Sequence, residues 1–265
     1  MAYIGYFSSV LIGISLGLIG GGGSILTVPV LVYLFSVDAV AATAYSLFIV
    51  GMTSAVGSVS YFRNGLVNVK TAVVFGIPSI IAVFLTRAYL VPAIPKQVFS
   101  VGDFIVSKSL LMLLLFAVLM IAASYSMIKK GKMTDEETAA PQVFNHPLIL
   151  LEGALVGVLT GLVGAGGGFL IIPALVLLSK LPMKEAIGTS LVIIAAKSLI
   201  GFFGESSETV INWGLIGPVT SLAVVGIFIG TYLSKRIDGA KLKPAFGWFV
   251  LVMGVYIILK ETVFK

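Results

Sequence analysis

Long stretches without a charged residue dominate this chain and predict helices that cross a membrane. At about 1.5 Å per residue, their lengths suit helices spanning about 30 Å of hydrocarbon, and none shows the sustained alternation of a barrel strand. An eighth segment, Ala186 to Gly204, carries a single charge, Lys197. The seven charge-free segments are Met1 to Val37, Ala39 to Phe62, Thr71 to Thr86, Ser109 to Ile128, Gly153 to Ser179, Thr209 to Ser234 and Pro244 to Leu259.

Composition assigns the broad class. With 58% hydrophobic and 11% charged residues, the chain cannot cover its apolar surface in water, so we expect an all-α polytopic protein of the lipid bilayer. The net charge of +6 requires no nucleic acid, because basic residues at membrane borders face anionic lipid. The absence of cysteine excludes thiolate metal sites, disulfides and cysteine nucleophiles. We expect no cofactor and no metal.

A glycine-rich break followed by a proline occurs twice, 144 positions apart (173 − 29 = 144). The first break is Gly20-Gly21-Gly22-Gly23 with Pro29, and the second is Gly164-Ala165-Gly166-Gly167-Gly168 with Pro173. Aligned without a gap, Gly13 to Leu34 and Gly157 to Leu178 share 11 of 22 residues. The chain is therefore a duplicated unit, and two interrupted membrane helices at matching positions indicate a transporter.

The topology depends on whether the interrupted segments cross the membrane or enter and return. If all segments cross the membrane, nine basic residues lie on one side and seven on the other. If both interrupted segments are re-entrant hairpins, eleven basic residues lie on one side and five on the other, and Arg87 is among the five. The second arrangement fits the positive-inside rule. It leaves three crossings per repeat, so the second repeat is inverted and both termini are non-cytoplasmic. We expect a first repeat over 1–130, a polar cytoplasmic linker over 131–146 and a second repeat over 147–265.

The two breaks have a physical consequence for binding. Irregular backbone cannot face lipid, so it must line a cavity or be covered by protein. The half-helices that follow would direct free amide groups and a partial positive charge toward that cavity, which favours an anion. Gly13, Gly17, Gly153 and Gly157 instead suit close packing of helices. The candidate substrate contacts at the breaks are Gly20, Gly21, Gly22, Gly23 and Ser24, and Gly164, Gly166, Gly167 and Gly168.

Two charged residues inside or near the apolar segments are further candidates. Lys197 lies in the middle of a segment, where a lysine costs about 2.5–3.5 kcal/mol, so it is expected to face a cavity and bind the anion. The alternative is a structural lysine bonded to carbonyl groups or paired with Glu152. Glu152 is a candidate for proton coupling, although an interfacial position is the favoured explanation because the ends of segments are hydrated. The repeat equivalent of Lys197 is Thr53, a further candidate contact.

Several hydroxyl and amide side chains have two alternative roles, one in substrate binding and one in helix structure. Ser46, Thr189 and Ser190 follow the breaks and could bond substrate oxygens, but serines and threonines also bond their own helix backbone. Asn68 and Asn212 open the third and seventh segments at equivalent positions, which favours helix capping. His146 has no second imidazole or cysteine for metal binding and is read as a solvated loop residue.

The glycine-rich repeats, Gly17 to Pro29 and Gly161 to Pro173, resemble those of the TauE/SafE family of sulfite and organosulfonate transporters. The residues Ala42 to Ser46 and Ala186 to Ser190 extend the resemblance, which covers almost the whole chain. It implies a multi-pass permease of the bacterial-type inner membrane that moves a small sulfur-containing anion. The family is too varied for the resemblance to name the substrate.

The sequence thus predicts a transporter, not an enzyme, for an anion such as sulfite or a sulfonate, working by alternating access around the two breaks. A passive channel remains an alternative. A membrane-embedded enzyme is disfavoured by the lack of paired histidines, a nucleophile elbow or paired intramembrane aspartates. A subunit of a larger assembly gives no reason for two matched breaks. Direction, coupling ion and the presence of a homo-oligomer are left open.

Overall fold

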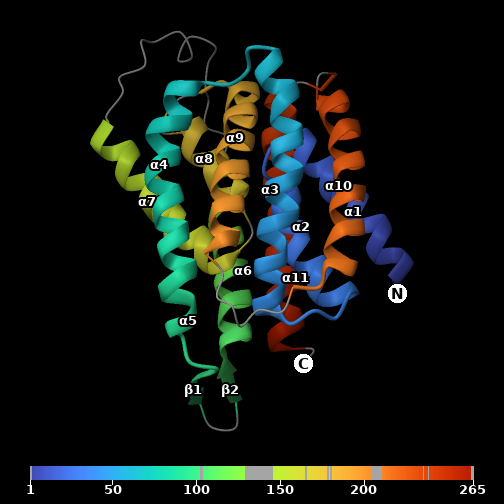
Figure 1. Cartoon of the computed structure of the whole chain (residues 1–265), viewed down its shortest axis with the longest axis vertical. Coiled ribbons are helices and arrows are strands. Elements are labelled where there is room, and N and C mark those ends of the chain that lie inside the picture. The colour runs from blue at the N-terminus through green and yellow to red at the C-terminus, as the bar shows by residue number, and fades with distance from the viewer. Residues whose placement is uncertain are drawn as a thin grey trace.

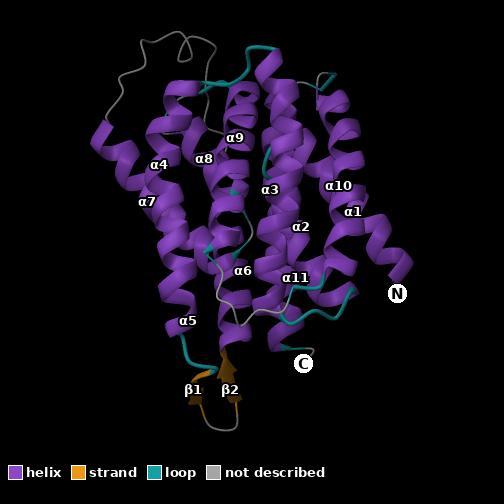
Figure 2. Ribbon diagram, in the orientation of Figure 1, coloured by secondary structure: helices purple, strands orange, loops and turns teal. Residues whose placement is uncertain are grey.

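The computed structural model describes residues 2–101, 104–128, 146–164, 166–177, 179, 181–204, 211–234, 236–237 and 239–263. The linker predicted over 131–146 lies outside this part of the chain, apart from His146, which is the first residue of a helix and not of a loop. The molecule is almost entirely helical, with one short antiparallel hairpin at one end (Figure 1, Figure 2).

The first half of the chain contains most of the irregular elements. In order they are α1 (Ala2–Ile19), α2 (Gly22–Pro29), the π-helical turn η1 (Val30–Leu34), α3 (Ala39–Arg63), α4 (Val69–Leu85), the π-helical turn η2 (Thr86–Leu90), α5 (Val91–Ala93), β1 (Gln97–Val101), β2 (Phe104–Ser107) and α6 (Lys108–Ile128). The second half contains α7 (His146–Val163), α8 (Gly168–Leu177), α9 (Met183–Phe203), α10 (Trp213–Ser234) and α11 (Gly239–Thr262).

Five helices in the described part of the chain are long and apolar enough to cross a membrane. They are α3, α6, α9, α10 and a continuous span over Val69–Ala93 that joins α4, η2 and α5. Their outward faces carry large apolar side chains such as Ile81, Phe203 and Phe228. The predicted multi-pass helical membrane protein is confirmed at this level.

The duplication in the sequence reappears in the positions where helices begin. The offset of 144 relates the first residues of α1 and α7 (146 − 2), of α3 and α9 (183 − 39) and of α4 and α10 (213 − 69). Asn68 Oδ1 accepts a hydrogen bond from the Thr71 amide at 3.0 Å, and Asn212 Oδ1 accepts one from the Leu215 amide at 3.2 Å. The two predicted caps are therefore confirmed.

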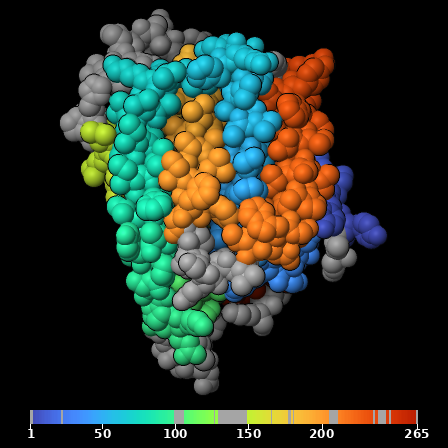
Figure 3. Space-filling view, in the orientation of Figure 1, coloured from blue at the N-terminus to red at the C-terminus, as the bar shows by residue number. Residues whose placement is uncertain are grey.

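Helices α4, α9, α3 and α10 lie side by side across one face of the molecule (Figure 3). The equivalent helices α3 and α9 pack against each other in opposite directions (Figure 1). A Cβ added at Gly51, near the middle of α3, would meet Leu199 toward the end of α9, and one added at Gly188, near the start of α9, would meet Tyr61 at the end of α3.

Each opening helix packs against a helix of the other repeat. Gly13 and Gly17 bring α1 against the backbone of α10 at Ala223 and Ile227. In the same way Gly153 and Gly157 bring α7 against the backbone of α4, at Phe75 and Ser79 respectively. These four glycines serve the close packing predicted for them, because a side chain at any of them would overlap main-chain atoms of the partner helix.

Candidate functional site

Both glycine-rich breaks reverse the direction of the chain. Gly20 has φ 74° and Gly164 has φ 69°, in the left-handed region that glycine adopts at low cost, and their amides close the last turns of α1 and α7. After the first break α2 returns alongside α1, because a Cβ at Gly23 would meet Leu16. The rings of Tyr6 and Phe35 pack edge to face with their centroids 5.3 Å apart, so this segment is a hairpin.

The two breaks meet inside the protein. A Cβ added at Gly21 would overlap the backbone of Gly168, and one added at Gly168 would overlap the backbone of Gly21. No side chain caps the N-terminus of α2. The N-terminal ends of α2 and α8 therefore approach each other, as the sequence predicts, and both carry partial positive charge. We call this region the glycine junction.

Lys197 points into the glycine junction. Its side chain is fully buried, Nζ donates a hydrogen bond to Thr160 Oγ1 at 2.8 Å, and a Cβ at Gly167 would lie 2.6 Å from Nζ. Lys197 therefore lies at the second break, and its role as a substrate contact stays a prediction. The partner of Nζ is a hydroxyl on α7, whereas Glu152 lies eight residues earlier on that helix (160 − 152), about 12 Å along its axis.

Arg87 is the residue that sequence reasoning missed. It was counted among the loop charges, but it is fully buried in η2, within the continuous span over Val69–Ala93. Its Nη1 donates to Thr43 Oγ1 at 3.0 Å, and its Nη2 packs directly against Gly164. Two signals could have identified it: the apolar run that continues after it to Ala93, and its repeat equivalent Thr231 (231 − 87 = 144), which lies inside the apolar segment Thr209 to Ser234.

Arg87 and Lys197 are the only charged side chains that are buried in the described part of the chain. Both contact the second break, at Gly164 and Gly167. A buried charge is costly unless an opposite charge or several hydrogen bonds compensate it. Two cations and two helix N-termini therefore make the glycine junction a place where a small anion would be stabilised. No group of three or more acidic or histidine residues that could hold a metal occurs among the described residues.

The buried hydroxyls of the predicted site, together with that of Ser198 beside Lys197, fall into two groups. Those of Ser24, Thr53 and Ser190 donate to carbonyl groups nearby in the chain, and that of Thr189 accepts from the Asn68 amide. Ser46 Oγ and Ser198 Oγ are buried and have no partner in the described structure. Ser198 Oγ would lie 3.2 Å from a Cβ at Gly166, beside Lys197, so a hydroxyl with unused bonding capacity faces the second break.

The remaining candidates lie as follows. Gly22 is the first residue of α2. Ser46 lies on the face of α3 between Thr43 and Val50, which contact Gly164 and Gly166 respectively. Glu152 is partly exposed and lies outside the glycine junction, so its role in proton coupling stays a prediction.

Comparison with known proteins gives one consistent result. The sequence model of the family described as sulfite exporter TauE/SafE matches residues 6–257. A probable membrane transporter protein of Xylella fastidiosa (strain Temecula1) is 31% identical over 95% of this chain and 92% of its own length. The probable membrane transporter protein YunE of Bacillus subtilis is 27% identical over 91% and 89%. No solved structure matches the chain at a significant level. The match to the family model spans nearly the whole chain, which therefore belongs to the sulfite exporter TauE/SafE family of membrane proteins.

Proposed function

We propose that this protein is a carrier that moves a small oxyanion, such as sulfite or a small sulfonate, across the bacterial inner membrane. The observation that carries the proposal is the position of Lys197, fully buried and placed against Gly167 at the glycine junction. The family description supports a sulfur-containing anion as the substrate. A compact oxyanion could accept hydrogen bonds from Lys197, from Ser198 and from backbone amides of the second break at the same time.

Alternating access is supported by the antiparallel packing of equivalent helices. With α3 and α9 in opposite directions, the two repeats are related by inversion, and each contributes one break to the glycine junction. The hairpin formed by α1, α2 and η1 favours re-entrant segments over plain crossings. Each repeat then has three crossings, which places both termini on one side of the membrane.

Charge indicates which side is cytoplasmic. At one end of the bundle, where α3 ends and α9 begins (the upper end in Figure 1), the described chain carries Arg63, Lys70, Lys184 and Arg236. The positive-inside rule assigns this end to the cytoplasm and the end with the β-hairpin to the outside. Both termini are then non-cytoplasmic.

Exchange in liposomes tests the function. Purified protein is reconstituted, and uptake of labelled sulfite or a small sulfonate is followed with and without excess unlabelled anion inside. We expect saturable uptake that internal anion accelerates, because a carrier returns faster when it is loaded. Saturable flux without acceleration would indicate a passive channel. Absence of flux across a panel of sulfur oxyanions, in vesicles whose protein remains folded, would contradict the proposal.

A further inference from the structure

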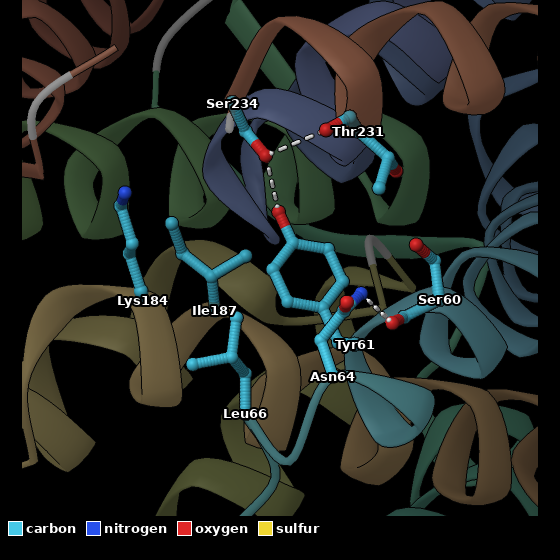
Figure 4. Close-up of a pocket in the computed structure, with 8 residues that line it drawn as sticks. All are labelled: Ser60, Tyr61, Asn64, Leu66, Lys184, Ile187, Thr231 and Ser234. Atoms are coloured by element: carbon cyan, nitrogen blue, oxygen red, sulfur yellow. Dashed lines mark hydrogen bonds between the residues drawn. The ribbon is translucent and has the colours of Figure 1, made fainter. Parts of the chain in front are cut away.

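A pocket lined by both polar and apolar side chains lies outside the glycine junction, where α3 and α10 end and α9 begins (Figure 4). Its volume is about 210 Å³, enough for several water molecules at about 30 Å³ each. Eight residues line it: Ser60, Tyr61, Asn64, Leu66, Lys184, Ile187, Thr231 and Ser234. We call it the α3–α10 pocket. It opens at the end of the bundle that carries Arg63, Lys184 and Arg236.

One side chain separates the α3–α10 pocket from the first break. Ile187 lines the pocket, and its Cγ2 would lie 2.9 Å from a Cβ at Gly20. Ser190 Oγ would also lie 2.9 Å from a Cβ at Gly20. The pocket and the glycine junction are therefore adjacent, and Ile187 forms the barrier between them.

Tyr61 completes this barrier through a hydrogen-bond network. Its hydroxyl lies 3.0 Å from the Gly17 carbonyl oxygen and 2.7 Å from Ser234 Oγ, which in turn lies 3.0 Å from the Thr231 carbonyl oxygen (Figure 4). Two hydroxyl groups have two hydrogens to donate, whereas the network contains three contacts. One contact always lacks a hydrogen, and it can be any of the three. The network therefore has three alternative arrangements, and its contacts connect α1, α3 and α10.

The lining suits an anion. Lys184 is the only charged residue among the eight, and it is exposed at the start of α9. Thr231 Oγ1 is more than nine-tenths buried, with 6% of the residue exposed, and has no hydrogen-bond partner in the described structure. A single positive charge and an unused hydroxyl favour a small, singly or doubly charged oxyanion over a cation.

The second break differs in the residues at the equivalent positions. The repeat equivalent of Ile187 is Thr43 (187 − 144 = 43), and that of Thr231 is Arg87 (231 − 144 = 87). At the second break the Arg87 side chain is fully buried and donates to Thr43 Oγ1, so a large side chain occupies the position where Thr231 leaves space. One break therefore has a pocket next to it, while the corresponding position beside the other is filled.

We propose that the α3–α10 pocket is an aqueous vestibule through which a small oxyanion reaches the first glycine-rich break, with Ile187 and Tyr61 as the barrier. This inference rests on the proposed function, since it assigns a route to the same substrate. It also assigns a state to the structure: accessible from the cytoplasmic end and closed toward the outside, where Arg87 fills the equivalent position.

The natural absence of cysteine permits a direct test. Thr231→Cys in reconstituted protein is treated with two membrane-impermeant methanethiosulfonate reagents, one with a sulfonate and one with a trimethylammonium group. We expect modification from one side of the membrane, with the sulfonate reagent preferred. Adding Lys184→Gln should slow the sulfonate reagent by about fivefold, the effect of one charge in aqueous surroundings, and should thereby lower that preference. Ser124→Cys, buried in α6, is the unreactive control. An unreactive Thr231→Cys, or an unchanged preference, would overturn the vestibule.

A second experiment examines the barrier. Ser190→Cys, which faces Gly20, should react slowly with the sulfonate reagent, and at least about tenfold faster when Ile187→Ala removes the apolar constriction. Ser46→Cys at the equivalent position near the second break should not accelerate in that background. Equal acceleration of both cysteines, or of neither, would contradict the barrier. Anion exchange by the unmodified protein is measured separately, so failure of the vestibule is distinguished from failure of the transport function.

Discussion

Tyr45 and Thr189 occupy equivalent positions of the two repeats (189 − 45 = 144), and each accepts a hydrogen bond from a backbone amide of the other repeat. The Asn68 amide donates to Thr189 Oγ1 at 2.9 Å, and the Asn212 amide donates to the Tyr45 hydroxyl at 3.0 Å. Both asparagines also cap a helix. Each repeat therefore holds the start of a helix in the other repeat.

Thr189→Val should destabilise the protein. The substitution keeps the shape but leaves the Asn68 amide without its acceptor, which costs about 1–3 kcal/mol. We expect a lower midpoint of thermal unfolding in detergent, followed by the helical circular dichroism signal. Thr220→Val is the matched control, since the Thr220 hydroxyl donates only to the carbonyl of Ile216 in its own helix. Equal shifts for both variants would argue against the contact between repeats.

Lys197→Gln should weaken binding of the transported anion. The variant loses a charge-assisted hydrogen bond worth about 1.5–3 kcal/mol. We therefore expect the anion concentration that gives half-maximal exchange to rise at least about tenfold. Lys260→Gln, on the exposed last turn of α11, changes the same net charge and should leave half-saturation unaltered. If both variants behave like the unmodified protein, Lys197 has a structural role in bonding Thr160.

Gly168→Ala should prevent close approach of the two breaks. The added methyl group would overlap the backbone of Gly21, and backbone cannot move aside as a flexible side chain can. We expect loss of exchange together with a lower unfolding midpoint. Gly217→Ala in α10 meets no atom within 4 Å and should be neutral or slightly stabilising, because alanine favours a helix by about 1 kcal/mol. Normal exchange in Gly168→Ala would show that the junction tolerates separation.

Two single variants at the equivalent positions, Arg87→Thr and Thr231→Arg, should change the access of the anion to the two breaks in opposite ways. Arg87→Thr empties the filled position at the second break, so we expect leak of anion that internal substrate no longer accelerates. Thr231→Arg fills the α3–α10 pocket and should block exchange. Both variants are compared in the liposome assay at matched protein content. A block by Arg87→Thr without leak would indicate that Arg87 binds substrate and does not close the pathway.

Side-specific labelling should establish the orientation. Asn64→Cys lies at the basic end of the bundle and Gln97→Cys in the β-hairpin at the opposite end. In inside-out vesicles an impermeant maleimide should modify the first and spare the second, and in right-side-out cells the pattern should reverse. The opposite result would place the basic end outside and contradict the positive-inside assignment.

The sequence was sufficient for features that depend on local pattern. Charge-free length predicted the membrane helices, the glycine repeats predicted two breaks at equivalent positions, and Asn68 and Asn212 were identified as caps from their place before apolar runs. These signals are local because a helix in lipid must satisfy its own backbone groups. The offset of 144 also makes Thr53 the repeat equivalent of Lys197.

Sequence pattern did not reveal the environment of Arg87. A basic residue at the end of an apolar run is ordinarily placed at the membrane border, and its contacts with Thr43 and Gly164 show that this one is buried. The bonds made by the Thr189 and Ser190 hydroxyls were equally open, since the same residue type serves a backbone or a ligand. Such roles depend on which distant segment lies opposite, which periodicity does not encode.

The packing of α1 against α10 has a consequence for synthesis. From the end of α1 to the start of α10 the ribosome must add 194 residues (213 − 19 = 194), which takes about 10–40 s at about 5–20 residues per second. Throughout this time the glycine face of α1, with Gly13 and Gly17, has no α10 to cover it. Helix α1 is thus made long before one of its final neighbours, so the insertion machinery or surrounding lipid must shelter that face while the chain up to α10 emerges.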